Sequence, residues 1–157
     1  MTEDDIAPQL GHLTIADLDF IIDCATIAES EDAEGQRRWD LWIGTAGRKM
    51  EFPPYGSFHW APNIRGDSVR VQGPSFESIV GQTVLVPAAY DYERDEYLFT
   101  MYVFEHSDVF DSRIRFLDRQ RGIFRIEWRG KCNIHFSKTY GESVPFAFLA
   151  DVQIRNS

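Results

Sequence analysis

The sequence predicts an all-β protein: an antiparallel β-sandwich of about eight or nine strands with little helix. Apolar and polar residues alternate along several segments, most clearly in the hairpin Asp111–Lys131 and in Val144–Ile154. Aromatic residues, which favour strands, make up 14% of the chain. No stretch between the strand-like segments has the pattern of a crossover helix, so parallel βαβ units are not expected. A closed or partly open β-barrel is the alternative architecture.

The first residues differ from the rest of the chain. Residues 1–12 are polar, contain Pro8 and Gly11, and show no periodicity. We expect a flexible N-terminal tail at 1–12, followed by a single β domain at 13–157.

The segment Leu13–Glu29 fits two kinds of element. Apolar residues alternate with aspartates, as on a strand: Leu18, Phe20, Ile22 and Cys24. A helical apolar stripe also runs through the segment, with Thr14 and Asp17 as capping residues. We expect a strand, because Arg38–Thr45 resembles its hairpin partner across the acidic linker Ser30–Gln36.

Residues 46–67 contain so many Gly and Pro residues that we expect a loop without any long element. Aromatic side chains in this loop must either pack under the domain or meet a ligand. Together with one tryptophan of the preceding strand, they form a predicted aromatic binding site: Trp42, Tyr55, Phe58 and Trp60. Packing in the core is the alternative role for these rings.

The remaining strands follow in close succession. They are expected at Val69–Gln72, Gln82–Ala89, Tyr97–His106, the two arms of Asp111–Lys131, Cys132–Phe136 and Val144–Ile154. Pro87 restricts its strand to a sheet edge or a bulge. Tyr97–His106 has no polar side, so we expect it at the centre of the structure with both faces covered.

Charge is unevenly distributed along the chain. The net charge is −9, which argues against general nucleic-acid binding and against adsorption to anionic membranes. Residues 113–131, however, contain six Arg and one Lys against Asp118 and Glu127. No apolar run approaches the length of a membrane span, and the start MTEDD does not resemble a signal peptide. We therefore expect a cytoplasmic protein.

The basic segment supplies the main candidate binding site. Alternation places four arginines on one outer face of the hairpin: Arg113, Arg115, Arg125 and Arg129. Guanidinium groups on neighbouring strands bind carboxylates or phosphates in a bidentate manner. Alternatively, these arginines pair with acidic neighbours such as Glu127 and only keep the sheet soluble.

Motifs of catalysis and cofactor binding are not found in the sequence. The four histidines show no metal-ligand spacing, and there is no G-x-S-x-G, P-loop or G-x-G-x-x-G motif. We therefore expect no metal, no cofactor and no catalytic residues, although distant carboxylates and a histidine can still converge. Cys24 and Cys132 are expected as buried reduced thiols, with a bridge between them as the alternative.

These observations favour a non-catalytic, cytoplasmic binding or protein-interaction domain, of which inhibitor and immunity-type proteins are examples. Either the basic ribbon or the acidic body is its docking surface, and the partner is a protein or a small ligand rather than nucleic acid or membrane. One alternative is a small-ligand-binding barrel or sandwich with an aromatic-lined pocket formed by Phe99, Met101, Tyr102, Phe104 and Phe148. The other alternative is an enzyme that depends on carboxylates and a histidine.

Overall fold

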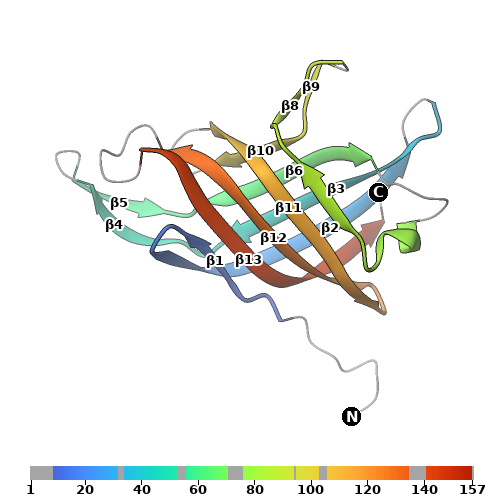
Figure 1. Ribbon diagram of the computed structural model, residues 1–157. Helices are drawn as coiled ribbons and strands as arrows, with labels where there is room; N and C mark the ends of the chain where they lie inside the picture. Colours follow the sequence, from blue (N-terminus) through green and yellow to red (C-terminus); the bar gives the residue numbers. More distant parts are fainter. Residues whose placement is uncertain are drawn as a thin grey trace, which may run out of the picture.

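The computed structural model describes residues 9–31, 34–52, 56–70, 76–93, 95–102, 106–134 and 141–156. Its strands are β1 (His12–Ile15), β2 (Leu18–Glu31), β3 (Arg37–Thr45), β4 (Arg48–Phe52), β5 (Gly56–Trp60), β6 (Asn63–Arg70), β7 (Thr83–Val86), β8 (Tyr90–Asp91), β9 (Glu96–Tyr97), β10 (Phe99–Tyr102), β11 (His106–Gln120), β12 (Ile123–Ile134) and β13 (Gly141–Asn156). A short 3-10 helix, η2 (Phe76–Ile79), precedes β7 (Figure 1). No described helix is long and apolar enough to cross a membrane.

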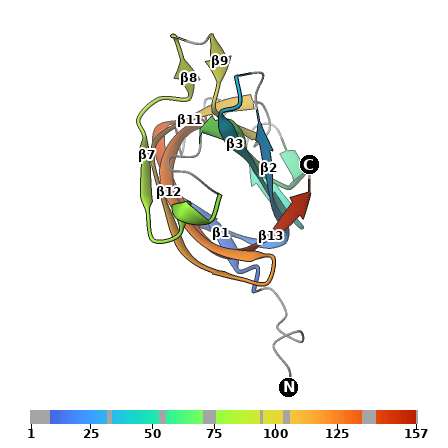
Figure 2. The ribbon, with the colours of Figure 1, turned by 90° about the vertical axis from the view of Figure 1, so that its right-hand side faces the viewer.

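Nine strands form one sheet in the order β10-β6-β3-β2-β1-β13-β12-β11-β7. The sheet curves so strongly that its two halves face each other across the interior, as the end-on view in Figure 2 shows. Strand β10 pairs with β6 and, over Thr100–Tyr102, also with β11. This short contact does not close the sheet into a barrel. The predicted all-β class, consistent with a β-sandwich, is confirmed.

The segment that fitted both a strand and a helix is extended, as expected. It forms a hairpin in which β1 and β2 pair antiparallel around a turn at Ala16, whose φ is 54°. Strand β2 then pairs with β3, the expected partner. Strand β1 lies between β2 and β13 over only part of their length. Past the N-terminal end of β1, the end of β2 pairs in parallel with the end of β13, from Thr26 opposite Gln153 onward.

A β-bulge between Ile22 and Cys24 changes the alternation along β2. Before it, Phe20 and Ile22 are buried; after it, Ala25 and Ile27 are buried instead. Cys24 therefore faces outward and is half-buried, so its prediction as a buried thiol is wrong. Both cysteines are free, Cys132 is buried, and no bridge joins them.

The expected loop at 46–67 is wrong, because the structure forms β4, β5 and most of β6 there. Of the breakers in described residues, Gly47 and Pro62 lie in the connections, whereas Gly56 begins β5 and Gly66 lies within β6. Gly47, between β3 and β4, has a φ of 75°. Pro62 precedes β6, and its carbonyl oxygen accepts a 2.7 Å hydrogen bond from the Thr45 hydroxyl. Because the connections are only a few residues long, a high frequency of Gly and Pro is compatible with three strands.

Two later segments also differ from the prediction. Tyr97–His106 is divided among β9, β10 and the start of β11, and β10 is paired on both sides, with β6 and with β11. Residues Cys132–Ile134 continue β12 and do not begin a new strand. By contrast, β7 is an edge strand that ends before Pro87, and the hairpin β11–β12 and strand β13 are confirmed.

Large aromatic and aliphatic side chains fill the space between the two halves of the sheet. The largest fully buried ones are Trp39, Trp60, Trp128, Phe20, Phe116 and Phe124. Several of these rings meet edge to face, such as Trp39 with Phe116 at 5.5 Å between ring centroids. The alternation read from the sequence thus produces one shared core, and the polar partners of each strand face outward.

Candidate functional site

The four predicted arginines lie on the outer surface of β11 and β12. All four side chains are exposed, while the residues between them are buried: Ile114, Phe124, Ile126 and Trp128. Pairing of the two strands places Arg113 directly opposite Arg129 and Arg115 directly opposite Glu127. Period-2 alternation is sufficient to explain this arrangement.

Arg125 differs from the other three because its partner is a buried carboxylate. Its Nε donates a 2.9 Å hydrogen bond to Oδ1 of Asp151 on β13, and Oδ2 of that carboxylate accepts another from the Gln9 backbone N–H at 2.9 Å. The Asp151 side chain is only 9% exposed. The hydrogen bond from Arg125 to Asp151 and the negative charge of Asp151 raise the pKa of Arg125. This guanidinium is therefore engaged within the protein.

The other arginines are less fully neutralised. Arg115 and Arg129 share Glu127, with N–O distances of 3.3 and 3.8 Å. Arg113 has no ion-pair partner among the described residues. An exposed leucine lies on each side of these arginines. Leu85 of β7 pairs with Arg113 and is 70% exposed. Leu149 of β13 pairs with Glu127 and is 49% exposed. We call Arg113, Arg115, Arg129, Leu85 and Leu149 the basic face.

The predicted aromatic site does not form as a unit. Trp60 is only 1% exposed and packs edge to face on Phe20 at 5.0 Å, so its assignment to a ligand-binding loop is wrong. It ends β5 with its ring turned into the core. Trp42 on β3 and Phe58 on β5 are 38% and 40% exposed but belong to different sheets. Tyr55 lies outside the described residues.

The predicted aromatic pocket also differs from the arrangement observed. Phe148 is buried in the core at 3% exposure, whereas Tyr102 is 42% exposed and faces solvent. The side chains of Phe99, Met101 and Phe104 lie outside the described part of the molecule. A ligand cavity lined jointly by Phe148 and Tyr102 is therefore not supported.

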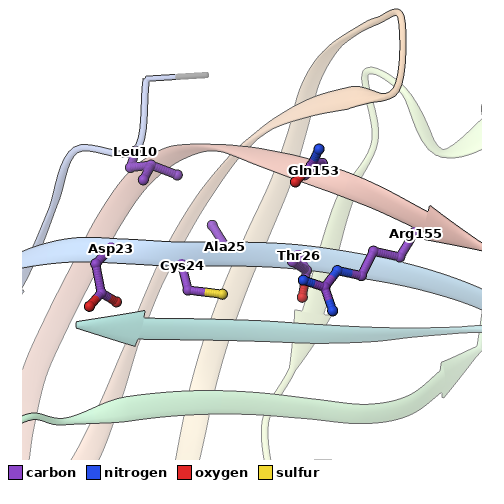
Figure 3. A pocket seen from close by; sticks show the side chains of 7 residues that line it. All are labelled: Leu10, Asp23, Cys24, Ala25, Thr26, Gln153 and Arg155. Carbon is purple, nitrogen blue, oxygen red and sulfur yellow. The ribbon is translucent and has the colours of Figure 1, made fainter. Parts of the chain in front are cut away.

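A different pocket, of about 220 Å³, opens on the outer surface where β1 gives way to the parallel pairing of β2 and β13. Its lining residues are Leu10, Asp23, Cys24, Ala25, Thr26, Gln153 and Arg155 (Figure 3). None of them belongs to the binding sites predicted from the sequence. Only the bulge and the parallel pairing bring them together, and neither depends on a local sequence pattern.

Titratable side chains provide little support for catalysis in the described regions. Among these residues, no three His, Cys, Asp or Glu side chains gather as a metal-ligand set. Burial raises the pKa of the Cys132 thiol to about 12, so it stays protonated and is not a nucleophile at neutral pH. His12 lies 3.4 Å from Asp19, but both side chains are more than half exposed.

Comparison with protein-family models, curated proteins and solved structures found no match. The basic face and the 220 Å³ pocket are therefore the two surfaces from which a function is inferred.

Proposed function

We propose that the protein is a non-catalytic binding protein that docks an acidic protein partner on its basic face. The main support is the direct cross-strand pairing of Arg113 with Arg129. Like charges opposite each other on neighbouring strands destabilise a sheet. Carboxylates of a partner would relieve this repulsion, and two adjacent guanidinium groups favour bidentate binding.

The leucines at the margins of the basic face supply the apolar component of an interface. Leu85 and Leu149 are both largely exposed, on either side of the arginines. Arginine is enriched among the residues that contribute most to binding energy in protein interfaces, whereas rim charges mainly affect the association rate. A partner that presents carboxylates beside apolar side chains would complement this surface.

A protein partner agrees better with the overall charge than a nucleic acid does. The chain carries −9, so a long polyanion would be repelled by the body of the molecule. An acidic patch of limited extent meets only the basic face. The competing hypothesis is that the acidic body itself binds a basic partner.

A peptide titration tests the proposal. The probes are two labelled peptides, one alternating Glu and Leu and the other alternating Lys and Leu, and fluorescence polarisation measures binding. The Glu–Leu peptide should bind, and added salt should weaken its binding because it screens exposed charges. Arg113→Glu should weaken binding by about tenfold or more, which corresponds to about 1.4 kcal/mol.

Lys49→Glu is the matched control, since Lys49 is also exposed and the substitution changes net charge by the same amount. It should leave the affinity for the Glu–Leu peptide nearly unchanged. A preference for the Lys–Leu peptide would contradict the proposal and favour the acidic body. Equal losses in both variants would show that net charge, rather than the basic face, controls binding.

A further inference from the structure

Strands β2 and β13 are neighbours in the sheet along only part of their length. Strand β1 separates these two strands along His12–Ile15, and they meet only from Thr26 and Gln153 onward. Residues 9–11 bridge the division: the Asp151 N–H donates to the Gln9 carbonyl at 2.8 Å, and the Ile22 N–H to the Gly11 carbonyl at 3.1 Å. The 220 Å³ pocket lies beside this bridge.

Four polar side chains line the pocket. The bulge in β2 places Asp23 and Thr26 at the pocket, and β13 contributes Gln153 and Arg155. None of the four side chains makes a hydrogen bond or ion pair within the described part of the chain. Figure 3 shows Arg155 reaching from β13 toward Thr26, with Asp23 farther along β2. A concave site with a few convergent polar groups is typical of small-ligand binding.

One predicted aromatic residue flanks this pocket. Trp42 pairs with Thr26 across β2 and β3, and Gly44 pairs with Cys24. The Trp42 Nε1 and the Asp23 Oδ1 lie 3.3 and 3.6 Å from the position that a Cβ on Gly44 would occupy. Because Gly44 has no side chain, the Trp42 indole and the Asp23 carboxylate both lie close to the Gly44 backbone. The Asp23 carboxylate supplies the negative charge that an ammonium ion needs, and the Trp42 indole lies beside it.

We infer that the pocket binds a small zwitterion with a protonated amine and a carboxylate joined by a short carbon chain. The amine lies at Asp23 beside Trp42, and the carboxylate accepts hydrogen bonds from Arg155, Gln153 and Thr26. The apolar side chain of Leu10 contacts the carbon chain. The volume equals that of roughly seven water molecules at about 30 Å³ each, which limits the ligand to the size of a small amino acid.

This site is separate from the basic face, so either proposal can fail without the other. Tryptophan fluorescence provides a local measurement. Of the four tryptophans, Trp39, Trp60 and Trp128 are at most 1% exposed, whereas Trp42 is 38% exposed. A neutral quencher such as acrylamide therefore acts mainly on Trp42, and Trp42→Phe should remove most of the quenchable emission.

The probe is 5-aminopentanoate, compared with pentanoate and pentylamine, which each lack one charged end. We expect saturable protection of Trp42 from acrylamide by 5-aminopentanoate at millimolar concentrations or below. Arg155→Gln and Asp23→Asn should each weaken this binding by about tenfold or more, which is about 1.4 kcal/mol. Neither single-ended probe should reach the affinity of the zwitterion.

Lys49→Gln and Asp108→Asn are the matched controls, since both side chains are exposed and lie outside the pocket. They should bind 5-aminopentanoate like the natural protein, and circular dichroism verifies that all variants are folded. The inference is overturned if 5-aminopentanoate gives no saturable protection. It is also overturned if pentanoate binds equally well, or if the Arg155 and Asp23 substitutions change nothing.

Discussion

Asp151 shows how one side chain fixes several parts of this structure. It lies on the outer side of β13, between the buried residues Ala150 and Val152. Burial alone raises the pKa of its carboxyl group, but hydrogen bonds from the Arg125 side chain and the Gln9 backbone, with the charge of Arg125, lower that pKa overall. The charged form is thus preferred in the folded state.

The lowered pKa has a direct consequence for stability. A carboxylate whose pKa is lower in the folded state stabilises the protein above its unfolded pKa, about 3.9, and this contribution disappears as pH falls through the folded pKa. At pH 7, Asp151→Asn should reduce the free energy of unfolding by about 1–3 kcal/mol. The difference from the natural protein should shrink below about pH 4. Urea unfolding at several pH values measures both effects.

Asp108→Asn is the reference for this measurement, because the Asp108 side chain is exposed. It should change stability little at any pH. A loss in Asp151→Asn that stays constant from pH 7 to acid would show that the charge of Asp151 is not the source of its contribution.

At the scale of the elements, Gly130 allows the close packing of β12 against β13. It pairs with Phe146, and a Cβ at Gly130 would lie 2.8 Å from Phe146 Cζ and 3.1 Å from Ser112 Oγ. The same Ser112 hydroxyl accepts a 3.0 Å hydrogen bond from the Trp128 indole. The Phe146 ring therefore occupies the space that a side chain at position 130 would need.

Gly130→Ala should lower the free energy of unfolding by about 1–3 kcal/mol through overpacking. In a Phe146→Leu background the same substitution should cost less, because the ring that it contacts is gone. Denaturant unfolding of both single variants and the double variant gives the coupling energy, expected at about 0.5 kcal/mol or more. Strictly additive losses would mean that Phe146 is not the obstacle.

Local periodicity accounts for the parts of the fold that were predicted correctly. In β11–β12 and β13, apolar residues such as Ile114 and Phe148 alternate with polar ones over long stretches, and burial follows that alternation. The bulge at Cys24 was not predicted, because its position depends on pairing with β3 and not on neighbouring residues. The strands at 46–67 were missed because breakers in short connections resemble breakers within one long loop.

The candidate sites could be predicted to different degrees, because some depend on local alternation and others on the pairing of distant strands. The outward orientation of Arg113 and Arg129 follows from alternation alone. The engagement of Arg125 does not, because Asp151 is 26 residues away in the sequence. The pocket was not predicted at all, since Asp23 and Arg155 come from distant strands and meet only through the parallel pairing of β2 with β13.

At the scale of the whole molecule, residues 9–11 connect the beginning of the chain to its last strand. Their backbone bonds join β2 and β13, so the predicted flexible tail at 1–12 does not include them. Residues 1–8 lie outside the described part. A chain that begins at His12 should melt about 5–10 °C below one that begins at Gln9, if three hydrogen bonds of about 1 kcal/mol each are lost.

Thermal unfolding followed by circular dichroism tests this prediction, with the chain that begins at Gln9 as the reference because it keeps every one of these bonds. Equal melting temperatures would show that residues 9–11 rest on the sheet without stabilising it.

The place of β13 in the sheet also determines when this protein can acquire its structure during synthesis. It follows every other described strand in the sequence, yet it lies between β12 and β1 near the middle of the sheet order. Until it arrives, β1 and β12 each have an unpaired edge, and such edges are prone to association with other chains. Folding must therefore follow translation of these strands rather than accompany it, and nascent chains would be the form most dependent on chaperones.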